Sequence, residues 1–264
     1  MCLILLAWRV HPRFPCVLAA NRDEFFSRPA VPAQWWPDHP QLLAGRDVLA
    51  GGTWLGITKQ GRFAGLTNFR QPGAQADTAR SRGMLVMDLL NSDQALSQSL
   101  AQLRDVGPNY NGFSVLFSDG RRLGVYESAS GSGRELPPGV YGLSNHLLDT
   151  PWPKVQQAKS RLATALQSLP DTADLRELLR DDRPAPDGLL PRTGVSQEWE
   201  RLLSSAFIRA PGYGTRCSTL ICVDARGGVQ FGEWSWDTTG TLSGEVHFTF
   251  ALAGNLEADR SGGL

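Results

Sequence analysis

Residues 16–30 read CVLAANRDEFFSRPA, and this stretch determines how the first part of the chain folds. The apolar run 16–20 stops at the polar run NRDE (21–24), and an aromatic pair (25–26) follows directly. Turns collect such polar residues, so one interpretation is a strand end followed by a turn. The other is that an amide, a cation and two carboxylates serve a site, with the aromatic pair returning the chain to the core.

A second apolar run, residues 2–9, precedes this stretch, and the connecting segment HPRFP (11–15) contains two prolines. Proline has no backbone N–H for a ladder, so these residues predict a hairpin loop between two antiparallel strands. The polar run then returns to the start of the chain.

The register of this hairpin depends on the length of its loop. One register pairs Val10 with Cys16, and Cys2 then lies opposite Glu24. A one-residue shift places Cys2 opposite Asp23 instead. Such a shift also moves every side chain to the other face of the sheet, so both registers stay open.

Cys2 becomes the first residue if Met1 is removed, and aminopeptidases generally remove methionine before a residue as small as cysteine. The thiolate is a nucleophile, and nearby cations raise its fraction. A free α-amino group has a pKa of about 7.7 to 8 and can act as a base. One residue would then supply both nucleophile and base, with Asp23 beside Arg22 orienting the amine.

The composition is that of an ordinary globular protein. Of 264 residues, 41% are hydrophobic, 26 are Lys or Arg and 26 are Asp or Glu, so the formal net charge is zero. This balance argues against nucleic acid and anionic membranes as partners. No apolar stretch approaches the roughly 18 residues of a membrane span and no signal peptide is evident, so we expect a cytoplasmic protein without integral membrane contact. The four cysteines match no zinc spacing, and we expect no metal site.

Hydrophobic periodicity predicts an α+β fold, with strands, helices, strands, helices and strands in that order. Most strands are joined as hairpins, so we expect two largely antiparallel sheets with helices outside them in one domain (1–252), followed by a loose tail (253–264). The predicted strands are 2–9, 16–20, 53–58, 63–67, 113–117, 123–127, 141–143, 218–223, 229–236 and 245–251. Predicted helices begin near residues 81 and 92 and cover 152–169, 171–179 and 196–207, and predicted loops cover 28–40 and 180–194.

Eight short motifs follow one another along the chain. They are the initial Met-Cys, NRDE (21–24), GTWLG (52–56), TNFR (67–70), SRG (81–83), YNGF (110–113), GLSN (142–145) and YGTRCSTL (213–220). From Met1 to about Phe250 this set resembles the NRDE family, also called the transport and Golgi organisation protein 2 family. The resemblance implies the N-terminal nucleophile hydrolase fold, a four-layer αββα sandwich of two antiparallel sheets flanked by helices.

Within that fold, the chain is similar to the cysteine branch that includes penicillin V acylase and bile salt hydrolases. The resemblance implies that Cys2 is the nucleophile and that Asp23 is the aspartate at the end of the second strand. Asn145 matches the distal asparagine and Arg216 the late arginine. Asn68 is a weaker match to the asparagine of the oxyanion hole.

Four further residues are candidates for substrate binding, namely Arg22, Trp54, Arg70 and His146. The acylases carry their arginine a few residues earlier than Arg22, so the resemblance gives Arg22 no role. Arg70 and the SRG motif would anchor a helix start or bind an anionic group there. Trp54 also suits the core or a pocket wall, and a lone histidine such as His146 is more often structural.

Structural roles remain open for the catalytic candidates too. Cys2 could be a buried strand residue, and Arg22 with Asp23 could be a structural ion pair. Asn68 and Asn145 could belong to turns, and Arg216 could brace a loop.

Two functions follow from these residues. The first is an amide hydrolase that acts on a small N-acylated substrate, with Cys2 as nucleophile and no required cofactor. The second is a binding or trafficking protein for haem or an amphipathic, acyl-CoA-like or lipid-like ligand, because members of the resembled family are linked to such ligands. The sequence has no haem-attachment motif, and we also consider a homodimer.

Overall fold

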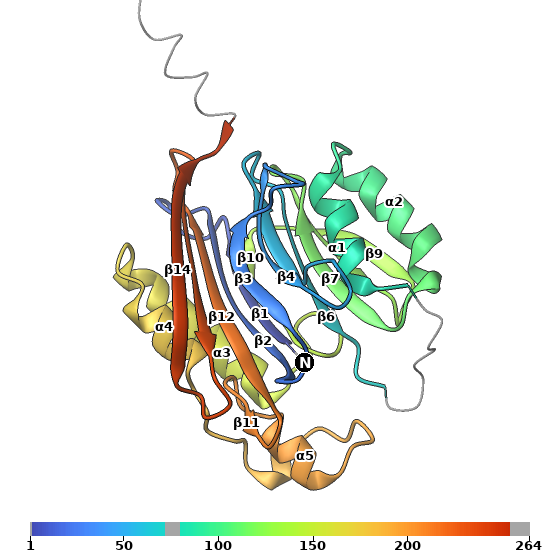
Figure 1. Cartoon of the computed structure of the whole chain (residues 1–264), viewed down its shortest axis with the longest axis vertical. Coiled ribbons are helices and arrows are strands. Elements are labelled where there is room, and N and C mark those ends of the chain that lie inside the picture. The colour runs from blue at the N-terminus through green and yellow to red at the C-terminus, as the bar shows by residue number, and fades with distance from the viewer. Residues whose placement is uncertain (1, 72–79, 254–264) are drawn as a thin grey trace, which may run out of the picture.

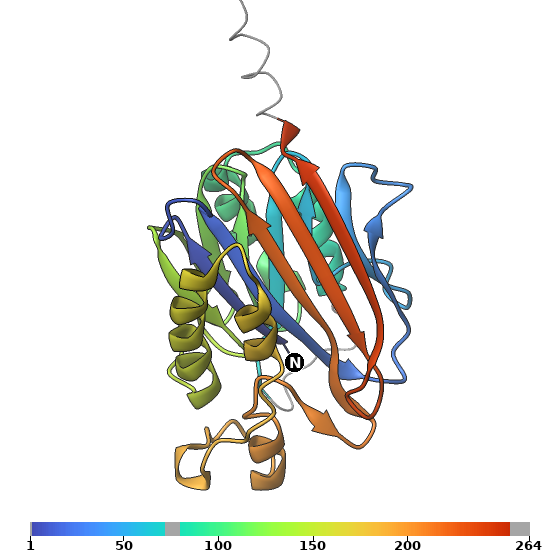
Figure 2. The ribbon, with the colours of Figure 1, turned by 90° about the vertical axis from the view of Figure 1, so that its left-hand side faces the viewer.

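The computed structural model describes residues 2–71 and 80–253, and it contains two antiparallel sheets between two layers of helices. Figures 1 and 2 show the sheets facing each other, with α3 and α4 outside one sheet and α1 and α2 outside the other. This arrangement confirms the predicted α+β class and the αββα order of layers. Met1 and most of the predicted tail lie outside the described residues, so the domain boundary at residue 252 stays a prediction.

The first sheet has the strand order β10-β1-β2-β12-β13-β14, and the short β11 pairs with β12. Its strands are β1 (Cys2–Trp8), β2 (Cys16–Phe25), β10 (Gly139–Leu143), β11 (Arg209–Ala210), β12 (Tyr213–Val223), β13 (Gly228–Trp236) and β14 (Leu242–Ala251). The N-terminal strand therefore lies inside the sheet, between β10 and β2.

The second sheet is a meander in which each strand pairs with the next along the chain. Its strands are β3 (Ala30–Trp35), β4 (Leu42–Asp47), β5 (Leu55–Thr58), β6 (Phe63–Asn68), β7 (Phe113–Ser118), β8 (Leu123–Glu127) and β9 (Ser132–Leu136). The α-helices are α1 (Arg82–Asn91), α2 (Leu96–Val106), α3 (Pro153–Ala165), α4 (Ala173–Leu179) and α5 (Gln197–Leu202), and short 3₁₀ turns cover Gly107–Asn109, Leu166–Ser168 and Asp187–Leu189.

Every second residue of a strand faces the same side, so the apolar strand β1 contributes to two cores. Leu3 and Leu5 pack with residues of α3 and α4. Ile4 and Leu6 pack between the two sheets. Cys2 has the same parity as Ile4, so its side chain belongs to the side that faces the second sheet.

The observed register corrects both predicted pairings of the first hairpin. Cys2 pairs with Arg22, and Trp8 is the last residue of β1 to pair with β2. The ladder ends early because Arg9 has a positive φ of 54° and its N–H donates to the Pro15 carbonyl at 2.6 Å. The shift from the first predicted register is two residues, so Arg22 and Glu24 still share the face of Cys2, and Asp23 has the opposite face.

The NRDE run is not a turn, because β2 continues through it to Phe25. Asn21 is fully buried, and its amide donates to the carbonyls of Leu179 and Ala206 at 2.8 Å each. The prediction that the aromatic pair returns to the core was wrong for Phe25, which is 55% exposed and packs edge-to-face on Tyr213.

Strands β3, β4 and β9 were missed, and β3 lies within a predicted loop. Pro32 is tolerated in β3 because this is an edge strand whose register shifts between Val31 and Gln34. Two helices also differ from prediction. α2 begins at Leu96, and α5 covers only the first part of the predicted helix 196–207.

Candidate functional site

A cavity of about 480 Å³ lies between the two sheets, at the end where β1 begins. Its walls come from β1, β2, β12 and β13 of the first sheet, from β3, β4 and β6 of the second, and from the start of α1. Cys2, Arg22, Asp23, Glu24, Asn68 and Arg82 are among the lining residues. The start of the chain and the NRDE run, which lie at the open end of the first hairpin, therefore line the same cavity.

Cys2 is 9% exposed and borders this cavity. Its backbone N–H donates to Asn145 Oδ1 at 3.4 Å, and its carbonyl accepts from Ser144 Oγ at 3.1 Å. Burial raises the pKa of the Cys2 thiol, while the charge of Arg22 and the backbone N–H of Asp23 oppose this rise. The resting side chain is therefore a neutral thiol that needs a base before it can attack.

Asp23 lies on the opposite face of β2 and is almost completely buried. Its Oδ1 accepts from Thr215 Oγ1 at 2.7 Å, and its carbonyl accepts from Tyr213 Oη at 3.1 Å. Burial raises the pKa of the Asp23 carboxyl, and the neighbouring charge of Lys154 and the Thr215 hydrogen bond lower it. Thr215 and Lys154 therefore stabilise the charged form of Asp23, although its side chain does not share the face of the Cys2 side chain.

Lys154 comes from the first turn of α3 and is 4% exposed. Its Nζ donates to the Leu203 carbonyl at 2.9 Å. Burial lowers the pKa of Lys154 to about 8, and the charges of Asp23 and Cys2 act in the opposite direction. Lys154 therefore belongs to the same electrostatic cluster as the predicted nucleophile and carboxylate.

Asn145 and Asn68 have different positions. The Asn145 side chain is occupied on both sides, because Oδ1 faces the Cys2 nitrogen and Nδ2 donates to the Asn68 carbonyl at 2.9 Å. The side chain of Asn145 therefore holds the backbone of Cys2 and is not available for an oxyanion. Asn68 ends β6 and lines the cavity, so it is the better placed of the two for that role.

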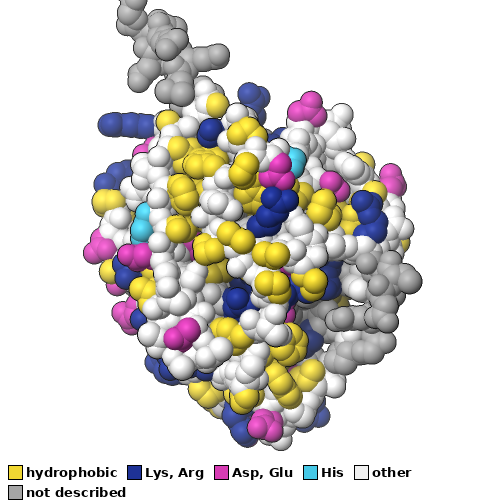
Figure 3. All heavy atoms as spheres, viewed as in Figure 1, with side chains coloured by type: hydrophobic (Ala, Val, Ile, Leu, Met, Phe, Trp, Pro, Cys, Tyr) yellow, Lys and Arg dark blue, Asp and Glu magenta, His cyan; other side chains and the backbone are white. Residues whose placement is uncertain are grey.

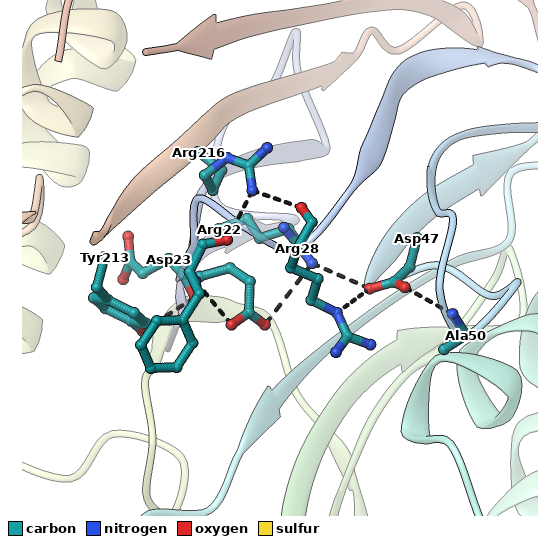
Figure 4. Close-up of polar contacts among 9 residues, drawn as sticks. Arg22, Asp23, Arg28, Asp47, Ala50, Tyr213 and Arg216 are labelled. Atoms are coloured by element: carbon teal, nitrogen blue, oxygen red, sulfur yellow. Dashed lines mark hydrogen bonds and ion pairs between the residues drawn. The ribbon is translucent and has the colours of Figure 1, made fainter. Parts of the chain in front are cut away.

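Arg22 belongs to a charged cluster on the cavity wall. Asp47 Oδ2 accepts from Arg28 Nε at 2.5 Å and from Arg22 Nη2 at 3.3 Å (Figure 4). Glu24 Oε2 is 3.9 Å from Arg22 Nη2. Two carboxylates thus fix the Arg22 guanidinium beside Cys2.

Arg216 also lines the cavity, at the bulge where the pairing of β12 with β2 shifts between Thr215 and Cys217. Its Nη1 donates to the carbonyls of Phe25 and Arg28 at 2.9 and 2.8 Å (Figure 4). These contacts match the role of a brace for the chain between β2 and β3, which was the structural alternative for this residue.

Arg70 and His146, which were predicted to bind substrate, are not among the residues that line the cavity. Arg70 Nη1 forms a buried ion pair with Glu200 at 2.8 Å and lies over the ring of Trp152. His146 Nδ1 is 2.9 Å from Thr150 Oγ1, and its ring packs against Phe69. Trp54 does line the cavity, as predicted for a pocket wall.

Several residues of the site were not singled out from the sequence. Thr215 and Tyr213 lie inside the quoted motif YGTRCSTL, which could have indicated them. Asp47, Lys154 and Glu233, the last of which also lines the cavity, lie outside all eight motifs, and no signal in the sequence marks them.

The described residues contain no group of three or more His, Cys, Asp or Glu side chains arranged to hold a metal ion. Within the same part of the chain, no helix is long and apolar enough to cross a membrane. Figure 3 shows basic, acidic and hydrophobic side chains intermixed on the face viewed in Figure 1.

Comparison with known proteins gives matches over most of the chain. A family model described as Transport and Golgi organisation 2 matches residues 1–238. The chain is 37% identical over 271 residues to the Transport and Golgi organization protein 2 homolog of Bos taurus, with 90% of this chain and 97% of the relative covered. For the homolog of Homo sapiens the identity is 38% over 258 residues, with 89% and 93% covered. Among solved structures, a mutant conjugated bile acid hydrolase from Clostridium perfringens aligns with a TM-score of 0.43 and 12% identity, covering 95% of this chain and 96% of that one.

Proposed function

The chain belongs to the Transport and Golgi organisation 2 family, and we propose that it is a cysteine amidohydrolase with Cys2 as its nucleophile. The proposal requires removal of Met1, which turns the nitrogen of Cys2 into a free amine. The observation that carries it is the position of Cys2, which borders the cavity while its nitrogen faces Asn145 Oδ1 at 3.4 Å.

In the first half of the reaction, the Cys2 sulfur attacks the amide carbonyl of a bound substrate and its proton passes to the Cys2 amine. The carbonyl oxygen becomes an oxyanion, for which Asn68 is the candidate donor. When the C–N bond breaks, the ammonium group returns its proton to the leaving amine. The products of this half are a free amine and a thioester on Cys2.

In the second half, water attacks the thioester and the same amine takes the proton of the water. The C–S bond breaks, the acid leaves, and the ammonium group returns its proton to the sulfur, which restores the thiol. Asn145 Oδ1 accepts from the amine, and the charge of Asp23 stabilises its protonated form. A base so close to the sulfur is needed because burial raises the pKa of the thiol.

Binding without turnover is the competing function. The residues that could ligate a haem iron decide whether the cavity suits haem. The described lining includes the thiols of Cys2 and Cys217 but no methionine and no histidine. His146 is engaged elsewhere, so the cavity does not fit a haem held by imidazole. An amphipathic acyl ligand remains compatible with walls such as Trp54 and Leu66.

The test is turnover of a panel of N-acyl substrates by wild type, Cys2→Ala and Cys16→Ala. Alanine is also small, so Met1 processing should be preserved in the first variant. We expect Cys2→Ala to lose about 1,000-fold or more in kcat/KM, as removal of a nucleophile does. Cys16 is buried away from the cavity, so its variant should retain activity. Equal turnover by Cys2→Ala and wild type would exclude the mechanism.

A further inference from the structure

The first turn of α1 forms part of the cavity wall, through Ser81, Arg82 and Gly83. The helix has ten residues, its N-cap Ser81 makes no side-chain cap bond, and its first turn contains no acidic residue. The backbone N–H groups at such an end carry partial positive charge and attract anions. Among the described residues, this end of the helix thus faces the ligand space without an acidic residue in its own first turn.

Arg22 supplies a second, independent observation. Its side chain is 10% exposed and lines the same cavity. Asp47 and Glu24 engage Nη2, but Nη1 is buried with no hydrogen-bond partner among the described residues. A buried donor without a partner costs free energy, and an anion bound in the cavity would remove that cost.

Arg82 adds a second cation at this end of the cavity. Its Nη1 donates to the Gly112 carbonyl at 3.0 Å, and no carboxylate of the described residues lies within ion-pair distance of it. Burial lowers the pKa of this guanidinium, and the charges of Glu24 and Cys2, which line the same cavity, act in the opposite direction. Four acidic residues, namely Asp23, Glu24, Asp47 and Glu233, also line the cavity, and repulsion from their carboxylates opposes the binding of an anion there.

We propose that the N-terminal end of α1, Arg82 and Arg22 together bind a compact anionic group of the ligand, a carboxylate or a phosphate, beside Cys2. The ligand is then an anionic molecule whose reacting bond lies near its charged group. The statement about the reacting bond rests on the proposed function. The anion site does not, because an anion can bind there without any turnover.

Two alkylating agents of similar size test the site directly. Iodoacetate is anionic and iodoacetamide is neutral, and with either the Cys2 sulfur forms a C–S bond while iodide leaves. The rate of Cys2 labelling is measured by peptide mass spectrometry for wild type, Arg82→Gln, Arg82→Lys and Arg104→Gln. Arg104 is an exposed residue of α2, so its variant removes the same charge outside the cavity.

We expect the ratio of iodoacetate to iodoacetamide rates to fall about tenfold in Arg82→Gln, because a charge-assisted contact is lost. Arg82→Lys should restore most of the ratio, and Arg104→Gln should leave it unchanged. Labelling is also measured with inorganic phosphate or acetate at equal ionic strength. Stronger protection of Cys2 by phosphate would indicate a phosphate ligand, and stronger protection by acetate would indicate a carboxylate ligand. An identical ratio in wild type and Arg82→Gln overturns the anion site, whereas absent hydrolysis alone would overturn only the amidohydrolase.

Discussion

Lys154 and Asp23 are opposite charges buried behind the strand that carries Cys2. Each shifts the pKa of the other toward its charged form, while burial acts against both. Burying a lysine costs free energy unless an opposite charge or a hydrogen bond compensates for the lost hydration. The charge of Lys154 therefore favours the ionised form of Asp23, which is the form that could interact with an ammonium group at Cys2.

This pair makes stability depend on pH in an unusual window. The pKa of Lys154 falls from 10.5 in an unfolded chain to about 8 in the fold, so between these values the unfolded state binds more protons. The free energy of unfolding should therefore rise with pH from about 8 to about 10.5, by up to about 3 kcal/mol. Chemical denaturation of wild type and Lys154→Met across this range measures the difference. An equal rise in both proteins would show that Lys154 is not the responsible group.

Some residues of the site could be predicted from the sequence. Cys2 and Asp23 could be placed together because a hairpin returns the chain to its start, whatever its register. The preference for Asn68 over Asn145 as an oxyanion donor could not be predicted, because it depends on one hydrogen bond between residues 77 positions apart. The position of Lys154 near Asp23 could not be predicted, because no local sequence pattern indicates which face of a sheet a helix covers.

At the scale of elements, α1 is held against the segment before β5 by two glycines. A Cβ on Gly52 would lie 2.4 Å from the Gly83 backbone carbon. Thr53 N also donates to the Gly83 carbonyl at 3.4 Å. Two of the motifs, GTWLG and SRG, therefore meet here and bring the end of the helix to the cavity.

We expect Gly52→Ala to lower the free energy of unfolding by about 1 to 3 kcal/mol, because backbone atoms must move apart to admit the methyl group. Gly188→Ala is the matched control, since a Cβ there meets no atom within 4 Å. Thermal or denaturant unfolding of both variants checks this. Equal stability of the Gly52 variant and wild type would mean that the contact is looser than described.

Elements with strong patterns were predicted well, and those without them were missed. Apolar strands such as β1 and β7 agree with prediction to within a residue or two. β9 escaped prediction because four of its five residues are exposed or partly exposed, which leaves no hydrophobic alternation. The pairing of β1 with β2 differed by two residues from the first predicted register and by one from the second, because Arg9 leaves the ladder in a left-handed conformation that no sequence pattern indicated.

At the scale of the whole molecule, a buried ion pair ties the end of β6 to α5. Arg70 follows Asn68 closely, and its partner Glu200 also accepts from the Thr193 N–H and hydroxyl at 2.7 and 2.6 Å. The Arg70 N–H donates to the Asn145 carbonyl at 2.8 Å. The pair therefore connects the outer helix with both asparagines near Cys2.

Removal of one partner should be costly because the other charge stays buried. We expect Glu200→Gln to lower the free energy of unfolding by about 3 kcal/mol. Asp187→Asn breaks the exposed pair with Arg201 and should cause no measurable change. Unfolding curves that coincide for Glu200→Gln and wild type would contradict the structural role of the pair.

The layer order of the molecule followed from the sequence because hairpins imply antiparallel sheets and amphipathic helices must cover them. The cavity did not, because it is formed by residues from strands of both sheets and from α1. Side-chain partners across such a space depend on how the sheets stack, which no single segment encodes.

In the proposed reaction Cys2, freed of Met1, carries the acyl group of the substrate as a thioester. Intact-mass spectrometry before and after rapid acid quenching with an N-acyl substrate panel tests it most directly. We expect a starting mass lacking methionine and a quenched species heavier by one acyl group, mapped to Cys2 and absent in Cys2→Ala. Retention of Met1, together with no acyl adduct on Cys2 under any substrate, would contradict it.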